Sequence, residues 1–472
     1  MNNREIVEVF KFTSQEIKRL ESLGQTNPKQ AAAEIGLHSG IGITHEEFPK
    51  IHYECGKAAA KRLYEMAAKK LLDFADLRGR VEVGTFLKPM TAEFAKRALI
   101  NGNTINEKLI EMILQEAITR AKGHLENRIY FFPVYALQMQ DSEDFVLDGI
   151  RFFLVRRFWQ EIEPQIERSV DIAVEDEAKK SSDSKHVRKH LLNLFSLAKQ
   201  HYGNYRWIAC VEIRGAEKSI GWKKAREVLE QTLNLLRLPI LSREGQFIGI
   251  ADESSVPRSN SRVSLNLTAN NQYEASHSIS YVEPHVEKEF LHKFRQKVPQ
   301  ISFLERAIEK VRQWETPDEI EDRLLTALFW FGEAWKENRP LPKIVKFSTS
   351  LESLFATQDS NDSIAEKISE RLAWLSYFGD ADWEKRSQTF TDMKAVYGAR
   401  SKAVHGASVS KSRDLLLRGR QAEELARLGV FAFSQLPPLF DGRQNKEQKL
   451  QEFFTRLKLE GFEQAQKLLS QA

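Results

Sequence analysis

Cysteine is scarce in this sequence, since only Cys55 and Cys210 occur among 472 residues. They lie far apart and in none of the spacings that zinc ligands use, which argues against a disulfide framework and a cysteine-based zinc site. A strong charge imbalance is also missing, because 70 basic and 66 acidic residues leave a formal net charge of +4. Any contact with nucleic acid must therefore come from a local basic patch. We expect two reduced cysteines in a cytoplasmic protein.

Long apolar runs are absent as well. No run reaches the roughly 18 apolar residues that a membrane span needs. The most apolar window, Ile150 to Trp159, is broken by Arg151, Arg156 and Arg157. The first residues lead into a charged segment, so we expect no signal peptide and no membrane partner. The sequence also has no P-loop, no paired aspartate motif for metals and no internal repeat, which argues against nucleotidyl or phosphoryl transfer.

Within the first 300 residues the sequence pattern changes near residue 75, from helical to a mixture of helix and strand. Residues 1–75 are predicted to be helical, because segments such as Ala58 to Leu72 are rich in strong helix formers. Residues 76–300 are predicted to be a mixed α+β region, with an Asp148-Gly149 hairpin signal inside Phe145 to Phe152. Further segments there are predicted to be strands at 81–86, 205–213, 246–251 and 262–268, a helix at 221–236 and loops at 179–189 and 254–261.

From residue 316 onward the pattern is helical throughout. Thr316 is predicted to be an N-cap in front of Pro317, and Ser363 to Glu366 has the spacing of a capping box. Helices are predicted at about 319–335, 364–375, 383–405, 413–436 and 445–471. The fold class predicted for the whole chain is α+β, in which an N-terminal and central mixed α/β region precedes an all-α helical bundle at 316–472. The boundary is expected near 300–315.

The segment Tyr397 to Gly406 carries the most specific chemistry. It places Arg400 five residues before His405, near the end of a predicted helix. Arginine suits phosphate recognition, and a histidine side chain, with an unperturbed pKa near 6.5, can both give and take a proton near neutral pH. RNA carries its own nucleophile, the 2′-hydroxyl. A base, an acid and a cation over the developing phosphorane charge are then enough to cut it.

Arg400 and His405 meet poorly on one ideal helix, because five residues turn the second side chain by roughly 140°. Either the helix loosens before Gly406, or the site combines two copies of the chain around a two-fold axis. The competing interpretation is structural. In that case His405 ends the helix and Arg400 is a charged residue at the edge of the core. The spacing of two residues does not decide between these interpretations.

The segment from about 318 to 436 resembles a HEPN domain, most closely the Apea-like HEPN group. Ala399 to Gly406 (ARSKAVHG) is similar to the family's "leucine-arginine-serine-lysine-isoleucine-valine-histidine-glycine" signature. Phe347 to Phe355 (FSTSLESLF) and Ile368 to Ala373 (ISERLA) resemble two helices that precede it in the family's order. The resemblance covers a quarter to a third of the chain. It implies a helical bundle that commonly forms homodimers, and active members that are metal-independent ribonucleases in antiphage defence or toxin systems.

The resemblance implies particular roles for four residues. Arg400 and His405 take the active-site positions, Ser401 the polar position after the arginine, and Glu352 the place of an acidic residue. No cofactor or metal is implied, and RNA, tRNA included, is the expected substrate. Residues 1–300 are expected to bind a defence-system protein or a phage-derived trigger.

Basic residues surround the motif. Lys394, Lys402, Lys411 and Arg413 are candidates for contacting an RNA backbone, although they also suit a solvated helix face. Two functions therefore stay open. One is an endoribonuclease effector that cuts RNA at a dimeric Arg-x4-His site. The other is a non-catalytic dimerisation or scaffold subunit that binds RNA or a protein partner.

Overall fold

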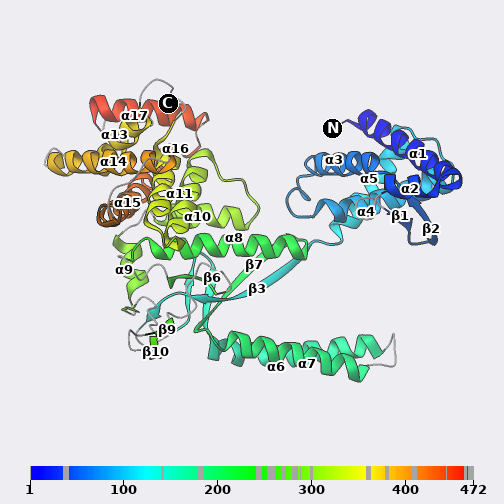
Figure 1. Cartoon of the computed structure of the whole chain (residues 1–472), viewed down its shortest axis with the longest axis horizontal. Coiled ribbons are helices and arrows are strands. Elements are labelled where there is room, and N and C mark those ends of the chain that lie inside the picture. The colour runs from blue at the N-terminus through cyan, green and yellow to red at the C-terminus, as the bar shows by residue number, and fades with distance from the viewer. Residues whose placement is uncertain are drawn as a thin grey trace. The chain divides into compact units, whose positions relative to one another are not determined.

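The computed structural model describes residues 2–35, 42–139, 143–178, 184–240, 247–251, 262–267, 273–278, 285–287, 289–297, 301–357, 363–377, 382–405, 412–442, 444–461 and 465 (Figure 1). The chain divides into two compact units. Unit 1 comprises Met1–Ile129 and Glu212–Ala225, and unit 2 comprises Tyr130–Val211 and Arg226–Ala472. The fold class is α+β, as the sequence predicts, with a helical C-terminal region and a small sheet earlier in the chain.

Unit 1 is a helical unit with one short β-hairpin. Its first helix starts with a capping box in which Asn2 and Glu5 satisfy each other's backbone amides. The core includes Phe10 and Phe94, whose ring centroids lie 4.6 Å apart. The elements are α1 (Asn3–Thr26), α2 (Pro28–Ile35), β1 (Gly42–His45), β2 (Phe48–Glu54), α3 (Lys57–Leu71), α4 (Val83–Phe94), η1 (Ala95–Ile100) and α5 (Glu107–Lys122). The antiparallel pair β1–β2 lies within the segment that was predicted to be helical.

The predicted strand at 81–86 is wrong, because α4 begins at Val83. Its buried residues Phe86, Leu87, Met90 and Phe94 recur at helical spacing, and this period only becomes visible beyond residue 86. A six-residue segment is too short to separate a strand from the start of a buried helix.

The central sheet has five strands in the order β5-β6-β7-β3-β8, and the predicted hairpin is confirmed within it. Asp148 and Gly149 both adopt positive φ, 53° and 68°, which the tight turn of a two-residue hairpin requires. The strands are β3 (Glu126–Tyr135), β5 (Phe145–Leu147), β6 (Ile150–Leu154), β7 (Trp207–Ala216) and β8 (Gly249–Ile250). Four further strands of the central region pair outside this sheet, as β9 (Arg262–Leu267) with β10 (Tyr273–Ser278) and β11 (His285–Val286) with β4 (Gln138–Met139).

Three helices belong to the central region. The predicted helix at 221–236 is confirmed by α8 (Lys218–Arg237). The predicted loop at 179–189 is wrong in its second half, because α7 (Ser184–Tyr202) begins there and packs on α6 (Val155–Ala178). Residues 179–183 and the predicted loop at 254–261 lie outside the described residues.

The C-terminal region is helical, as predicted. The segment expected to hold the boundary is itself occupied by α10. The helices are α9 (Phe290–Lys297), α10 (Ile301–Arg312), α11 (Glu319–Lys336), α12 (Pro340–Phe355), α13 (Ile364–Ser376), α14 (Trp383–Val404), α15 (Ser412–Phe433), α16 (Pro437–Phe440) and α17 (Lys446–Glu460). Helix α12 packs on α11, α14 and α15, and α13 packs on α14 and α17.

Two predicted caps differ from those observed. The N-cap of α11 is Asp318 rather than Thr316, because its carboxylate reaches the amides of Ile320 and Glu321. Ser363 stands at the N-cap of α13 as predicted, but its side chain makes no capping hydrogen bond. In the described part of the chain no helix is both long and apolar enough to cross a membrane.

Candidate active site

Helix α14 places Arg400 at the end of its buried face. Arg386, Thr389, Met393 and Val396 are the buried residues of this helix, at alternating spacings of three and four. The next position in this series, four residues after Val396, is Arg400. A cation thus occupies a position where the pattern calls for a core residue, so it needs a partner.

That partner is Glu352, on the neighbouring helix α12. Pro340 starts α12 at its first position, where the missing amide hydrogen is not needed. The apolar stripe of α12 includes Ile344, Phe347 and Leu351, which are fully buried. Glu352 follows directly on Leu351, so it lies at the flank of the stripe. Because α12 packs on α14, this flank meets the end of the buried face of α14.

Arg400 and Glu352 form an ion pair that is only partly exposed. Nη2 of Arg400 lies 3.1 Å from Oε1 of Glu352 and donates a hydrogen bond to Oε2 at 3.4 Å. Their side chains are 25% and 21% exposed, so the pair is neither buried in the core nor freely solvated. The contact to Oε1 is close but poorly aligned. Oε1 of Glu352 and Nε of Arg400 are buried atoms without a hydrogen-bond partner among the described residues.

Tyr397 is a third member of this cluster, and the sequence analysis did not single it out as functional. Its ring centroid lies 5.3 Å from the Arg400 guanidinium carbon. Burial raises the pKa of the Tyr397 hydroxyl to about 12, helped by its hydrogen bond to the Glu352 carboxylate. The hydroxyl therefore stays protonated and donates to that carboxylate. The available signal was its position three residues before Arg400, which puts both side chains on one helix face.

His405 ends α14, as predicted. It is the C-cap, with φ −88° and ψ 7°, and its backbone amide donates to the carbonyl of Ser401 at 3.0 Å. Its side chain is exposed, whereas that of Ser401 is half-buried. The helix stays regular through Val404, so it does not loosen between Arg400 and His405. The structure therefore brings Glu352 to Arg400, whereas His405 lies five residues further along the regular helix, roughly 140° around its axis from Arg400.

The predicted RNA-binding residues fall into three groups. Lys394 is exposed, with its ammonium 3.7 Å from Glu366 and 5.3 Å from the Phe390 ring centroid. Lys402 is exposed in the last turn of α14. Lys411 lies outside the described residues, and Arg413 is described only as part of the backbone of α15.

A metal site would need several His, Cys, Asp or Glu side chains close together. Among the described residues, no three His, Cys, Asp or Glu side chains gather in a way that would hold a metal ion. The chemistry available at the end of α14 is thus that of a guanidinium, a carboxylate, a phenol and an exposed imidazole.

Comparisons with known proteins give no family. No protein-family model, no curated protein and no solved structure matches this chain.

Proposed function

We propose that the helical C-terminal region is an endoribonuclease of the HEPN type that works without a metal. The observation that carries the proposal is the Arg400–Glu352 ion pair. Arg400 lies on α14 five residues before the exposed His405, which ends the same helix. The guanidinium of Arg400 is a suitable donor to a phosphate oxygen. Its Nε is buried without a hydrogen-bond partner among the described residues, and such an atom calls for an explanation. The HEPN-like motif supplies the same residues independently.

In the proposed reaction the 2′-oxygen of a ribose attacks the adjacent phosphorus and the bond to the 5′-oxygen breaks. The products are a 2′,3′-cyclic phosphate and a free 5′-hydroxyl. His405 transfers the proton from the 2′-hydroxyl to the leaving 5′-oxygen. Arg400 stabilises the negative charge that builds on the non-bridging oxygens. Glu352 and Tyr397 orient the guanidinium, and Ser401 takes the polar position that follows the arginine in the HEPN-like motif. DNA is spared because it has no 2′-hydroxyl.

The proposed site is composite. Arg400 and His405 of one protomer diverge by roughly 140° on a regular helix, so one copy cannot direct both at a single phosphate. In a two-fold dimer, Arg400 of one protomer can face His405 of its partner. Two-fold symmetry then repeats the same contact, with the roles of the two protomers exchanged, at a second site.

Cleavage of total RNA in EDTA tests the activity. We expect the full chain to produce cyclic-phosphate ends, and both His405→Ala and Arg400→Ala to lose at least about a hundredfold in rate. His190→Ala is the matched control, because it removes an exposed histidine from α7. Intact RNA with the unaltered chain, under conditions where it is folded and assembled, would count against the proposal.

Mixing two inactive variants tests the composite site. If Arg400 and His405 act across the interface, a mixed dimer of Arg400→Ala with His405→Ala holds one intact site. Random mixing should restore about a quarter of the unaltered activity, because half of the dimers are mixed and each has one working site of two. No recovery, or full activity in a monomer by size exclusion, would contradict the arrangement.

The alternative is a non-catalytic dimerisation or scaffold subunit, and one observation favours it. Arg400 already has a counter-ion within its own protomer, so its charge is explained without a substrate. This alternative predicts intact RNA and an unchanged assembly in the His405→Ala variant. The mixing experiment and the cleavage assay together separate the two functions.

The remaining parts of the proposal concern partners and cellular role. RNA, with tRNA among the candidates, is the proposed substrate, and a second copy of the chain is the proposed assembly partner. A role in antiphage defence or as a toxin, in the cytoplasm, follows from the HEPN-like motif alone. Residues 1–300 are proposed to receive a defence-system protein or a phage-derived trigger, since the nuclease needs a control.

A further inference from the structure

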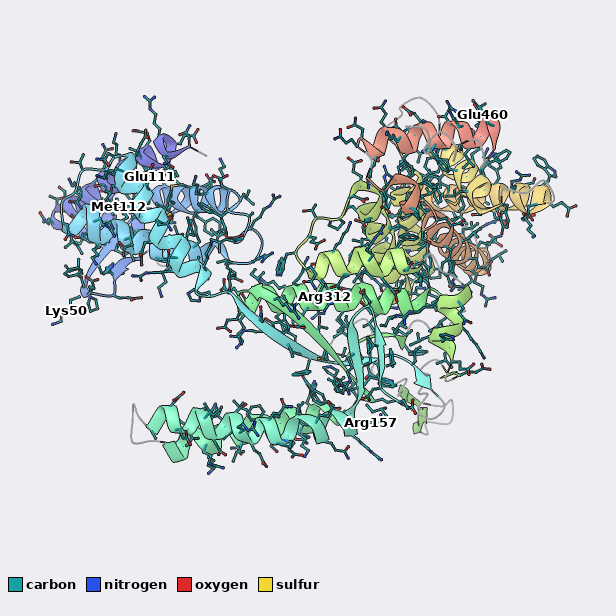
Figure 2. All side chains as sticks on the ribbon, turned by 180° about the vertical axis from the view of Figure 1, so that it is seen from behind. Lys50, Glu111, Met112, Arg157, Arg312 and Glu460 are labelled. Carbon is teal, nitrogen blue, oxygen red and sulfur yellow. The ribbon has the colours of Figure 1, made fainter. Side chains whose placement is uncertain are left out.

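A cavity between α13 and α17 lies apart from the Arg400 cluster. It has a volume of about 350 Å³ and is lined by residues of both helices. The two helices are in contact (Figure 1), and Glu460, the last residue of α17, is labelled in Figure 2. Typical ligand sites have volumes of roughly 300–1,000 Å³, so this cavity suits a small ligand or one unit of a chain.

The wall from α13 presents Lys367, Glu370, Arg371 and Trp374. Their spacing of three, four and seven residues from Lys367 puts them on one helix face. Trp374 is held in place, because the guanidinium carbon of Arg386 lies 4.5 Å from its ring centroid. This wall thus combines a fixed indole with two cations and one carboxylate.

Arg371 is held even more firmly. Its Nη1 donates to the carbonyl of Phe355 at 2.5 Å and to Oγ1 of Thr357 at 2.9 Å. Its guanidinium carbon also lies 4.7 Å from the Phe454 ring centroid. A guanidinium fixed by three contacts is preorganised, so little entropy is lost when it binds an anion.

The opposite wall comes from α17 and is partly apolar. It contributes Leu457, Leu459, Thr455 and Lys458, besides Phe454. Lys458 pairs with Glu370 at 2.9 Å, but the two side chains are 56% and 30% exposed. Such an exposed ion pair is worth little, so an incoming phosphate can replace the carboxylate at Lys458.

We propose that this cavity binds a nucleotide unit, either free or within an RNA strand. The planar base would lie against Trp374 and the leucines, and the phosphate would meet the cations Lys367, Arg371 and Lys458. Glu370, once released from Lys458, accepts from an exocyclic amino group, which favours adenine or cytosine over uracil. An acidic peptide would use the cations but would leave the aromatic wall unused, so the lining favours the nucleotide.

Calorimetric titration of the full chain with AMP tests the proposal. Lys458→Glu and Lys367→Glu place a negative charge where the phosphate binds, and we expect each to weaken binding by about tenfold or more. Lys449→Glu makes the same charge change on α17, at a residue that does not line the cavity. That control should bind AMP like the unaltered chain.

The source of the nucleotide is decided in a second arm. A short single-stranded oligoadenylate is titrated into the His405→Ala chain, which keeps the RNA intact. Binding of the oligonucleotide but not of AMP, weakened by Lys458→Glu and Lys367→Glu, assigns the cavity to the RNA strand. Binding of AMP with the same pattern assigns it to a free nucleotide. Either result supports the proposal.

Three results would overturn it. One is that neither ligand binds. Another is binding that the two cavity variants leave unchanged, and a third is equal binding by inorganic phosphate or an oligoglutamate peptide. None of these results depends on RNA cleavage. A failed cavity and a failed nuclease can therefore be told apart.

Discussion

Asp148 makes stability depend on pH in a direction opposite to that of most acidic residues. It lies in the turn between β5 and β6, is only 8% exposed, and accepts a hydrogen bond from Oγ1 of Thr232 at 3.1 Å. Burial raises its pKa from 3.8 to about 8; Glu305 and Glu309 of α10 also raise it, and Arg312 (labelled in Figure 2) opposes them. The folded protein therefore holds this proton more tightly than the unfolded chain does.

The sign of the pH effect follows. Between about pH 4 and pH 8 the folded state binds more protons at Asp148, so stability falls as pH rises through this window and levels off above it. One proton amounts to about 1.4 kcal/mol per pH unit, which sets a ceiling of about 3 kcal/mol between pH 5 and pH 7. Allowing for local relaxation, we expect about 1 to 3 kcal/mol.

The substitution Asp148→Asn isolates this contribution. Asparagine before glycine suits the same turn with positive φ, and its amide oxygen can still accept from Thr232. The variant should match the unaltered chain near pH 5 and become more stable than it by about 1 to 3 kcal/mol at pH 7 and above. Asp171→Asn, at an exposed carboxylate of α6, is the control and should show no such divergence.

The chain has two compact units, so a single unfolding free energy is not defined for it. Pulse proteolysis in urea, with peptides of unit 2 followed by mass spectrometry, gives a midpoint for the relevant unit at each pH. Parallel midpoint curves for Asp148→Asn and the unaltered chain would refute the reasoning. So would a gain in the relative stability of the unaltered chain as pH rises.

Three further predictions concern the bundle. Tyr397→Phe should slow RNA cleavage several-fold and cost about 1 kcal/mol of stability, because the Glu352 carboxylate loses a donor; single-turnover cleavage and urea midpoints measure both effects. Glu352→Gln in a His405→Ala background should bind RNA about threefold more tightly by filter binding, because a charge about 6 Å from a phosphate contributes about 0.7 kcal/mol in water. Unchanged affinity would remove Glu352 from the phosphate site. Gly429→Ala should lower the urea midpoint, because a new Cβ would lie 2.6 Å from Cδ2 of Leu351. The control Gly419→Ala on the same helix meets nothing within 4 Å, so this variant should raise the urea midpoint.

Local patterns predicted the helices and the tight turn, and they failed where tertiary contacts decide. The Asp-Gly turn was predictable because two positive φ angles restrict the residue types so strongly. The N-cap of α11 was placed two residues too early, at Thr316 instead of Asp318. Thr316 and Asp318 are both good caps, each with a glutamate three residues later. Asp318 forms the capping box with Glu321, and its carboxylate also lies 2.7 Å from Nζ of Lys446 in α17. That contact joins residues far apart in sequence.

Most residues of the candidate site could be predicted from the sequence, but the contacts between their side chains could not. Arg400 and His405 stood out by their spacing, and the HEPN-like resemblance pointed to Glu352. Tyr397, the third residue of the cluster, was not singled out, because a sequence cannot show where a phenol's hydroxyl points. The same limit hid the α13–α17 cavity, whose two walls lie about 80 residues apart.

The charge balance at Arg400 bears on how the proposed nuclease would be controlled. Within one protomer Glu352 neutralises Arg400, so a phosphate gains little from approaching this pair alone. The Nε of Arg400 is buried and without a hydrogen-bond partner among the described residues, so it adds little to the attraction of a phosphate at the surface. Productive binding would then need additional positive charge. In the proposed two-fold dimer the second Lys402 would supply it, because each Arg400 is neutralised by its own Glu352. The Arg400–Glu352 ion pair would thereby make the proposed activity depend on assembly.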